Sequence, residues 1–467
     1  MDPAGCTQLI ILRSSIIITM YIINLDSVDA GTPGVGMKAA NLGTLARNGF
    51  LVPRGFVVTA DAFRKFLADT GIGLQLPKML EGLNPDDPKS AGLAYSQIRE
   101  IFAKFSGTDF LIRELKEAYN ELSFGKDVSS AGGVALDLIR AGRGDSFVSV
   151  RPSISSSHWG ASFAGHGKAV LNMIGYRQVL ASIKECWLSF YAPEAMLYRK
   201  LHGVEDASVA VLVQKMADSE LSGDLFTQEP VSADTGKILV EGWWGLGETL
   251  CCGCVSPDQY VIGKDGAQVS KRTAKKLWLR RRGPLSGTTI QEKVPASRVS
   301  IDTLAERDFP KFAAIAGKIE EILKGPQHVE WTVERGRIVI LQSSPVTFSR
   351  AQDSQAPGNL DRLAGGLGVS LGIASGKGKA VNDISQIQKP AEPSVLVVKT
   401  LSIGLLPFAK WFSGIVSEQG GAGSCMASVG RELGIPIVCG VENAGIILDG
   451  KAIVLDGRSG SVYLSGQ

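Results

Sequence analysis

A cysteine follows a run of glycines in the stretch 416–427, VSEQGGAGSCMA. The pair Gly420 and Gly421 predicts a tight turn, and the residues that follow predict a helix beginning near Cys425. Free backbone N–H groups at a helix start favour an anion, so a thiolate there would be a good nucleophile. The stretch therefore predicts a small exposed platform that presents Cys425 as a nucleophile.

Two basic residues have positions that suit a nucleotide phosphate. Lys38 follows the glycine turn 34–36 at the start of a predicted helix over residues 38–46. A lysine ammonium and free helix N–H groups converge there on one anion. Arg151 closes a predicted strand just before Ser153 and a loop rich in serine and glycine. Its guanidinium fork and the loop amides could hold a triphosphate together.

A predicted hairpin carries two oxygen donors. Residues 328–332 and 338–342 read as strands joined by a turn at Arg335-Gly336, which places Glu330 and Gln342 on facing strands. A carboxylate and an amide oxygen beside nucleotide phosphates could hold Mg²⁺. The alternative is a solvated polar pair between two strands.

The bulk composition gives no indication of a polymeric partner. A net charge of +3 over 467 residues gives no reason to expect a nucleic acid or an anionic membrane as partner. The basic run 275–282 alternates with leucine and tryptophan, which fits a solvated edge strand better than a nucleic-acid site. Residues 9–23 are largely apolar, but Arg13 interrupts them and they are too short to span a bilayer.

The seven cysteines are too few and too scattered for a disulfide framework. Three of them lie close together in the segment Cys251-Cys252-Gly253-Cys254, a spacing that could indicate a metal site. However, no second cysteine or histidine pair lies at zinc-finger spacing. We therefore expect small apolar side chains in a buried turn, free thiols and a cytoplasmic location.

The chain divides into zones that together indicate a mixed α/β or α+β fold. Residues 1–20 form an extension, with Met20 favoured as the natural start because the first predicted strand follows it. Residues 21–348 alternate strands punctuated by glycine with amphipathic helices. Residues 349–366 are polar and lack an apolar period, which predicts a linker. Residues 367–467 hold short apolar runs bounded by glycine or proline, typical of a compact second domain.

These motifs, in this order, resemble the family of phosphoenolpyruvate synthase, pyruvate phosphate dikinase and rifampin phosphotransferase. The resemblance spans about residues 21–464. It implies a nucleotide-binding domain of ATP-grasp type, followed by a small swivelling β/α domain that carries a phosphohistidine in the family. It also implies ATP and Mg²⁺ as cofactors, with Glu330 and Gln342 on the metal. The predicted catalytic residues are Lys38, Arg151 and Cys425.

The resemblance extends to further positions, and two of its departures fall on residues of the reaction itself. The family's nucleotide-binding motifs match here at Lys38, Arg151, Ser153, Gln214, Glu241, Gly247 and Glu248. A Pro-Asp pair follows at Pro257 and Asp258, as in the family. Ser344 stands where the family has an arginine on the reacting phosphates, and Cys425 stands where it has the carrier histidine. Both departures fall on residues that handle the moving phosphoryl group.

Three functions fit this pattern. Cys425 could replace histidine as the phosphoryl carrier of an ATP-dependent phosphotransferase. Alternatively, the ATP-binding domain could form an acyl phosphate, as ATP-grasp ligases do, and Cys425 could capture the acyl group as a thioester. The third is a protein that binds ATP and transfers nothing. The sequence shows no match to the family's acceptor domains, so we expect a small-molecule acceptor to bind between the two modules or at a site that a partner protein supplies.

Overall fold

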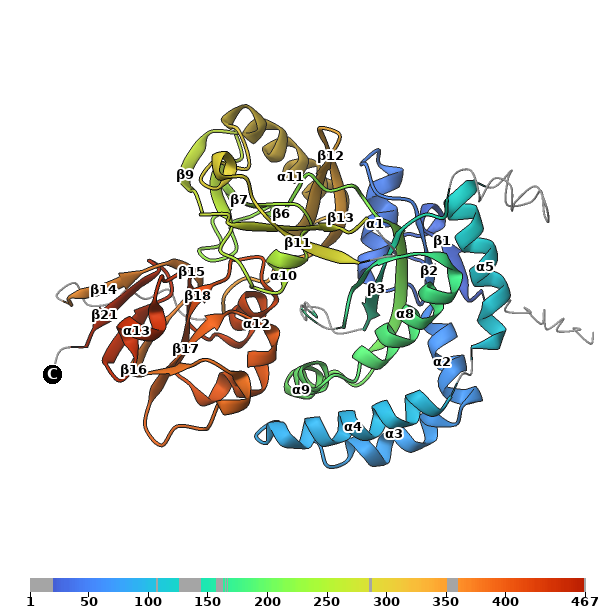
Figure 1. The fold of residues 1–467 in the computed structure, drawn as a ribbon, viewed down its shortest axis with the longest axis horizontal. Coiled ribbons are helices and arrows are strands. Elements are labelled where there is room, and N and C mark those ends of the chain that lie inside the picture. Colours follow the sequence, from blue (N-terminus) through green and yellow to red (C-terminus); the bar gives the residue numbers. More distant parts are fainter. Residues whose placement is uncertain are drawn as a thin grey trace, which may run out of the picture.

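The protein is described by a computed structural model for residues 20–105, 108–125, 144–156, 163, 165, 167–284, 288–350 and 360–465. The strands of these residues form three larger sheets and a two-stranded ribbon, and helices pack on them (Figure 1). The expected mixed α/β fold is confirmed. The expected extension, apart from Met20, lies outside the described residues.

The first sheet is antiparallel and carries three predicted site residues, Arg151, Ser153 and Gln214, on two neighbouring strands. Its spatial order is β1 (Ile22–Asn24), β2 (Gly55–Val58), β5 (Ser208–Lys215), β3 (Val148–Ser155) and β4 (Val170–Met173). In the register of β3 and β5, Arg151 lies opposite Leu212 and Ser149 lies opposite Gln214. Arg151 and Gln214 are therefore close on one face of the sheet.

Helices surround this sheet and supply much of the apolar core. They are α1 (Met37–Arg47), α2 (Ala60–Asp69), α3 (Ile72–Leu80), α4 (Pro88–Lys104), α5 (Asp109–Phe124), α8 (Gly175–Ser189) and α9 (Pro193–His202). Phe66 of α2 and Trp187 of α8 are fully buried, with ring centroids 5.0 Å apart. The predicted helix over residues 38–46 is confirmed as α1, which contacts β3 and the second sheet.

The second sheet contains the predicted hairpin. Its spatial order is β13 (Arg337–Pro345), β12 (Gln327–Glu334), β6 (Leu221–Phe226), β7 (Lys237–Trp244), β8 (Asp258–Gly263) and β9 (Gln268–Arg272). The helix α11 (Phe309–Leu323) covers it, and Phe312 meets Trp331 edge to face at 4.7 Å between ring centroids. A short helix, α10 (Glu248–Cys251), follows β7, and the ribbon consists of β10 (Trp278–Arg282) and β11 (Thr289–Lys293).

The C-terminal domain is built on a mixed sheet with a parallel centre. Its spatial order is β14 (Arg362–Gly365), β21 (Ser461–Leu464), β20 (Ala452–Asp456), β16 (Ile373–Val381), β17 (Ser394–Thr400), β18 (Gly414–Gln419), β19 (Ile437–Cys439) and β15 (Leu367–Ser370). The pairs from β16 to β19 are parallel. Its helices are α12 (Cys425–Leu433) and α13 (Ala444–Leu448).

The expected linker 349–366 is only partly described, because residues 351–359 are outside the description. Its last part does not behave as a linker, since residues 362–365 form β14 and pair with β21. The C-terminal sheet thus begins earlier than its apolar runs indicated. A strand as short as β14, with only Leu363 and Ala364 as apolar residues between Arg362 and Gly365, leaves no apolar period that a sequence pattern could reveal.

The C-terminal domain packs directly on the N-terminal helices. A single apolar cluster includes Phe66 and Trp187 on one side and Met426 and Ala427 of α12 on the other. In Figure 1 the C-terminal domain (orange and red) lies against α10 and α9. The Tyr198 hydroxyl of α9 donates a hydrogen bond of 2.7 Å to Glu432 of α12. The interface therefore joins an apolar core to specific polar contacts.

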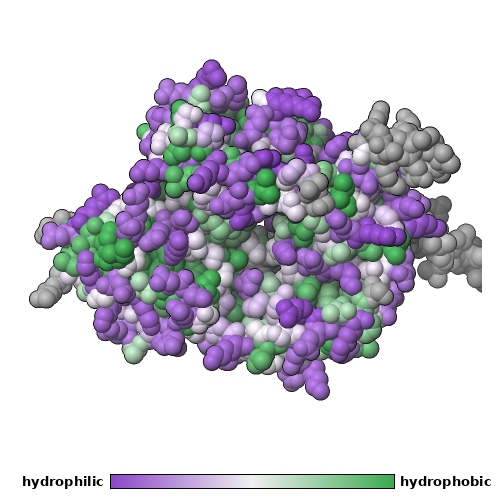
Figure 2. All heavy atoms as spheres, viewed as in Figure 1, coloured by the Kyte–Doolittle hydropathy of each residue, from purple (hydrophilic) through white to green (hydrophobic). Residues whose placement is uncertain are grey.

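Hydrophilic side chains cover most of the face seen in Figure 2, and one hydrophobic cluster lies over the C-terminal domain at the left. In the described ranges, no helix is both long enough and apolar enough to cross a membrane.

Candidate functional site

A cavity of about 430 Å³ lies where the two N-terminal sheets meet the C-terminal domain. Its lining includes most of the residues that the sequence singled out, which are Lys38, Arg151, Gln214, Gly247, Glu248, Glu330, Gln342 and Cys425. These residues come from positions up to 387 residues apart, if Lys38 and Cys425 are compared (425 − 38). A cavity of this volume is in the range that holds small ligands in proteins.

The start of α1 places Lys38 at this cavity. Gly36, the residue before the helix, has φ 74°, and a Cβ there would lie 2.3 Å from the Ser153 carbonyl oxygen. The Ser153 hydroxyl in turn accepts a hydrogen bond of 3.2 Å from the Ala39 N–H. Ser153 is not among the residues that line the cavity. It holds the helix start that presents Lys38, and nucleotide contact by Ser153 itself stays a prediction.

Arg151 is the centre of a polar cluster in the cavity wall. It donates hydrogen bonds to Gln214 Oε1 at 2.6 Å and to the Leu341 carbonyl oxygen. It also forms an ion pair of 3.2 Å with Glu330. Burial lowers the pKa of Arg151, and the charge of Glu330 opposes that change. The cluster fixes the guanidinium, and with it the positions of Gln214 and Glu330.

The predicted hairpin and its facing pair are confirmed: Glu330 and Gln342 are partners in the register of β12 and β13. Arg151 contacts only the Oε2 atom of Glu330. Glu330 Oε1 and the Gln342 amide oxygen are the hard donors that Mg²⁺ prefers. In the described ranges no group of three or more His, Cys, Asp or Glu side chains could hold a metal alone. The pair fits Mg²⁺ only where phosphates and water complete its ligands.

The turn after β7 forms another wall. Glu248 pairs with Arg280 of β10, and both residues line the cavity. The Leu246 N–H donates a hydrogen bond of 2.8 Å to the Arg280 carbonyl oxygen. The ribbon that carries Arg280 thus holds the Gly-Leu-Gly-Glu turn in place.

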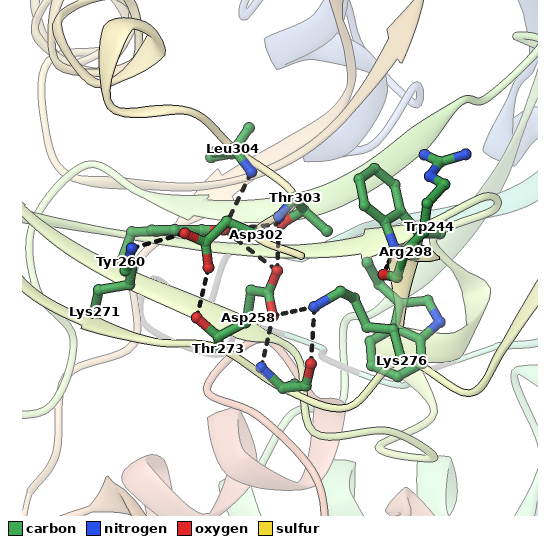
Figure 3. A network of polar contacts seen from close by, with 12 residues as sticks. Trp244, Asp258, Tyr260, Lys271, Thr273, Lys276, Arg298, Asp302, Thr303 and Leu304 are labelled. Atoms are coloured by element: carbon green, nitrogen blue, oxygen red, sulfur yellow. Dashed lines mark hydrogen bonds and ion pairs between the residues drawn. The ribbon is translucent and has the colours of Figure 1, made fainter. Parts of the chain in front are cut away.

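Asp258, of the Pro-Asp pair, organises a buried network behind this turn (Figure 3). Its carboxylate accepts hydrogen bonds from Lys276 Nζ at 2.6 Å, the Ala274 N–H at 2.7 Å and the Thr303 N–H at 2.8 Å. Lys276 and Asp258 are both fully buried. The expectation that residues 275–282 form a solvated edge is therefore wrong for Lys276, because Asp258 pairs with its charge inside the fold.

Glu241 binds the loop before Cys425, and it does not line the cavity. Its two carboxylate oxygens accept hydrogen bonds from the Ala422 N–H at 2.8 Å and the Gly423 N–H at 2.9 Å. Burial, and then the charge of Asp224, raise its pKa to about 7, and the two N–H groups oppose the rise. The predicted contact of Glu241 with the nucleotide stays untested, whereas its contact with the C-terminal domain is direct.

Cys425 is the first residue of α12, and the Ser424 hydroxyl accepts a hydrogen bond of 3.3 Å from the Ala427 N–H. The predicted helix start is confirmed, but Cys425 is only 7% exposed. The expectation of an exposed platform is wrong while the C-terminal domain is packed on the N-terminal part of the chain, because that part covers the loop. The thiol lies 3.0 Å from that of Cys251, sulfur to sulfur.

A smaller cavity of about 40 Å³ lies beside Cys425, lined in part by Ser344, His328 and Arg431. His328 Nε2 lies 2.7 Å from Asp224 Oδ1. Arg431 is fully buried, and it donates hydrogen bonds to the carbonyl oxygens of Thr347 and Ala422 at 2.7 and 3.1 Å. Arg431 thus joins the cysteine loop to the segment that follows β13.

Residue type alone did not reveal several of these contacts. Cys251, Arg431 and Glu432 all connect the two domains, and the motifs in which they lie gave no indication of that role. Cys252 and Cys254 form a disulfide, which corrects the expectation of free thiols in that turn. The close spacing of three cysteines was the one signal that could have indicated reactive sulfur there.

Comparison with known proteins decides the family. The model of the pyruvate phosphate dikinase AMP/ATP-binding domain matches residues 32–363. The chain belongs to this family. A second model, the mobile domain of PEP-utilising enzymes, matches residues 390–460, which include Cys425. The resemblance inferred from the motifs is therefore confirmed, while the domain boundaries at 348 and 367 stay predictions.

Relatives of the dikinase family extend the match over most of the chain. A probable phosphoenolpyruvate synthase of Archaeoglobus fulgidus is 35% identical over 95% of this chain and 58% of its own length. One of Methanothermobacter thermautotrophicus is 33% identical over 95% of this chain and 63% of its own length. The phosphoenolpyruvate synthase of Pyrococcus furiosus is 31% identical over 92% of this chain and 57% of its own length. The chain thus spans about three-fifths of the length of these relatives.

Proposed function

We propose that the protein is an ATP-dependent phosphotransferase in which Cys425 takes a phosphoryl group from ATP and passes it to a small-molecule acceptor. One observation carries the proposal: Cys425 lines the same cavity of about 430 Å³ as Lys38, Arg151 and Glu330. A nucleophile, two cations and a carboxylate around one cavity are the groups that phosphoryl transfer from a nucleotide requires.

The residues that line the cavity have separate roles in the proposed reaction. Lys38 and the N–H groups at the start of α1 neutralise phosphate charge. Arg151 keeps the Gln214 amide and the Glu330 carboxylate in place through its hydrogen bond and its ion pair. Magnesium, when bound by Glu330 and Gln342, would neutralise more of the negative charge of the phosphates. Such pre-positioned charges lower the barrier because they need not reorganise as the reaction proceeds.

The transfer itself exchanges one bond to phosphorus for another. The Cys425 thiol first loses its proton to water in the cavity. The thiolate then attacks the β-phosphorus of ATP, so an S–P bond forms while the P–O bond to AMP breaks, and the AMP oxygen keeps the electron pair. Water next attacks the terminal phosphorus, which releases inorganic phosphate and leaves one phosphoryl group on Cys425. The start of α12 stabilises the thiolate that attacks. In a second step the acceptor oxygen attacks phosphorus and the thiolate leaves.

Relatives bear the name phosphoenolpyruvate synthase, and this chain spans about three-fifths of their length. We therefore propose pyruvate, the keto acid of which phosphoenolpyruvate is the phosphorylated enol, as the first acceptor to test. The acceptor site is formed either by the face of α12 after the C-terminal domain moves or by a partner protein.

Identification of the nucleotide product tests the proposal. The full chain is incubated with ATP, Mg²⁺ and pyruvate, and the nucleotides are separated and quantified. We expect AMP and phosphate, and we expect Cys425→Ala to abolish their formation. Cys439→Ala serves as the matched control, since Cys439 is a buried free cysteine of the same domain that does not line the cavity.

Other outcomes favour the other functions. ADP formation that requires an amine and a carboxylate would indicate the ligase, with an acyl group on Cys425. Unchanged turnover in Cys425→Ala would exclude both cysteine mechanisms. Tight ATP binding without any turnover, with pyruvate or with phosphoenolpyruvate supplied in the reverse direction, would indicate a protein that only binds the nucleotide.

A further inference from the structure

Two free cysteines from different domains meet at the edge of the nucleotide cavity. Cys251 is the last residue of α10 and Cys425 is the first residue of α12. Their sulfur atoms lie 3.0 Å apart, although the residues are separated by 174 positions in the sequence. A disulfide bond has a length of about 2.0 Å, so the two sulfurs need to approach by only about 1 Å.

We propose that Cys251 and Cys425 form a reversible disulfide that locks the C-terminal domain onto the ATP-binding domain. This inference does not rest on Cys425 being a phosphoryl carrier. It concerns a covalent bond between the two domains, which the proposed transfer neither uses nor requires.

The backbone holds both sulfurs at their places. On the side of Cys425, Glu241 binds the N–H groups of Ala422 and Gly423, and Ser424 caps α12. On the other side, the turn after α10 lies tight against the C-terminal domain, because a Cβ on Gly253 would lie 2.2 Å from the Leu401 carbonyl oxygen. A pair fixed from both sides loses little freedom when the bond forms.

The remaining described cysteines lack such a partner. Cys252 and Cys254 are already bonded to each other. Cys186 and Cys439 are buried and do not line the cavity, so a small disulfide in the cavity does not reach them. The hydrogen bond with Cys425 raises the pKa of Cys251, so the exchange, which runs through the thiolate, should become faster as the pH rises. Within the described ranges, Cys251 and Cys425 are the free cysteines in mutual contact.

The cavity gives an oxidant access to the pair, and the reaction needs only a small-molecule disulfide. Both cysteines line the cavity, Cys251 is exposed and Cys425 is buried. The Cys251 thiolate attacks the small disulfide, which forms a mixed disulfide and releases one thiolate. The Cys425 thiolate then attacks the Cys251 sulfur, and the second small thiolate leaves. The protein loses two hydrogens, and two small thiols are formed.

Such a bond would have two effects. It would remove the Cys425 thiolate from any reaction, and it would prevent the C-terminal domain from leaving the cavity. A dithiol reductant would reverse both effects by the same exchange. The pair would therefore make the state of the protein depend on the ratio of small disulfide to thiol around it.

Peptide mapping under non-reducing conditions tests the inference. The full chain is incubated with oxidised glutathione, free thiols are alkylated, and the digest is analysed by mass spectrometry. We expect a peptide that joins Cys251 to Cys425, the loss of two alkylatable thiols per chain, and recovery of both with dithiothreitol. On a non-reducing gel the oxidised chain should migrate faster, because the bond closes a loop of 174 positions.

Variants separate this bond from the neighbouring disulfide. Cys251→Ser should abolish the cross-link and the paired loss of two thiols, whereas Cys439→Ser should retain both. The double variant Cys252→Ser, Cys254→Ser should also retain the cross-link, because the proposed exchange does not pass through that pair. Glutathione adducts without a cross-link, or a bond from Cys425 to Cys252 or Cys254, would overturn the inference.

The cross-link and the proposed transfer can be told apart by experiment. A chain that forms the cross-link but never carries a phosphoryl group supports this inference and contradicts only the transfer mechanism. A chain that transfers phosphate through Cys425 but forms no cross-link supports the transfer mechanism and contradicts this inference.

Discussion

Glu241 of β7 accepts a hydrogen bond of 2.9 Å from the backbone N–H of Gly423, although 182 positions separate the two residues. The same carboxylate binds the N–H of Ala422 at 2.8 Å. One buried side chain of the ATP-binding domain thereby holds the loop that leads to Cys425. The position of the Cys425 thiol depends on this contact between domains.

Docking of the C-terminal domain should depend on pH through Glu241. Burial in the docked arrangement raises its pKa from 4.5 to about 7. The docked state therefore binds the Glu241 proton more tightly than the undocked state does. Protonation of Glu241 stabilises docking fully below pH 4.5, and this stabilisation is lost as the pH rises through about 7. Each unit of pKa shift corresponds to about 1.4 kcal/mol. Small-angle scattering of the full chain should show a larger radius of gyration at pH 8 than at pH 5.

The variant Glu241→Gln checks the source of this effect. Its amide does not titrate, so the radius of gyration should become independent of pH between these values. A pH response of the same size in Glu241→Gln would assign the effect to another group.

The substitution Gly423→Ala should release the cysteine loop. A Cβ on Gly423 would lie 2.2 Å from Asp224 Oδ2, so the loop and β6 cannot keep their present separation. We expect alkylation of Cys425, followed by peptide mapping, to become about tenfold faster, which corresponds to about 1.4 kcal/mol of docking free energy. Gly445→Ala is the control, because its Cβ would meet Glu418 only at 3.8 Å. Equal rates in both variants would contradict the close approach.

The substitution Arg151→Lys should weaken ATP binding. A lysine keeps the charge but cannot bind Gln214, Glu330 and Leu341 at once, as the guanidinium does. We expect the Kd for ATP, measured by calorimetry, to rise about tenfold or more. Arg47→Lys, in a surface ion pair with Asp29, should leave it unchanged. An unaltered Kd in Arg151→Lys would remove Arg151 from the binding machinery.

The substitution Lys276→Met should destabilise the ATP-binding domain. It leaves the fully buried Asp258 carboxylate without its partner charge. Breaking a buried ion pair in this way costs about 3–5 kcal/mol, and we expect that loss in the free energy of unfolding by urea. Lys311→Met removes a lysine whose side chain is 65% exposed, and it should cost less than about 1 kcal/mol. Similar losses in the two variants would show that Asp258 does not depend on Lys276.

The sequence predicts those parts of the site that local structure determines. Lys38 could be placed because a glycine turn followed by an apolar period defines a helix start within a few residues. Glu330 and Gln342 could be paired because the turn at Arg335-Gly336 sets the register of a hairpin. In each case the sequence motif and the backbone structure that it predicts lie within the same short segment.

The contacts between domains could not be predicted in this way. The bond between Glu241 and the Gly423 N–H, and the approach of Cys251 to Cys425, join segments more than 170 positions apart. Their partners are set by how two folded domains pack, and no period or spacing records that. Ser153 illustrates the same limit, since the hydrogen bond that its hydroxyl accepts from the Ala39 N–H joins β3 to α1, 114 positions away in the sequence.

The measurement that tests the central claim most directly is the mass of the Cys425 peptide after a single turnover. The full chain is mixed with ATP and Mg²⁺ without acceptor, quenched, digested under conditions that preserve phosphocysteine, and analysed by mass spectrometry. We expect one phosphoryl group on Cys425, its loss when an acceptor is added, and an unmodified Cys439 peptide. A Cys425 peptide that stays unmodified while the nucleotide is consumed would contradict the proposal that this cysteine carries the phosphoryl group.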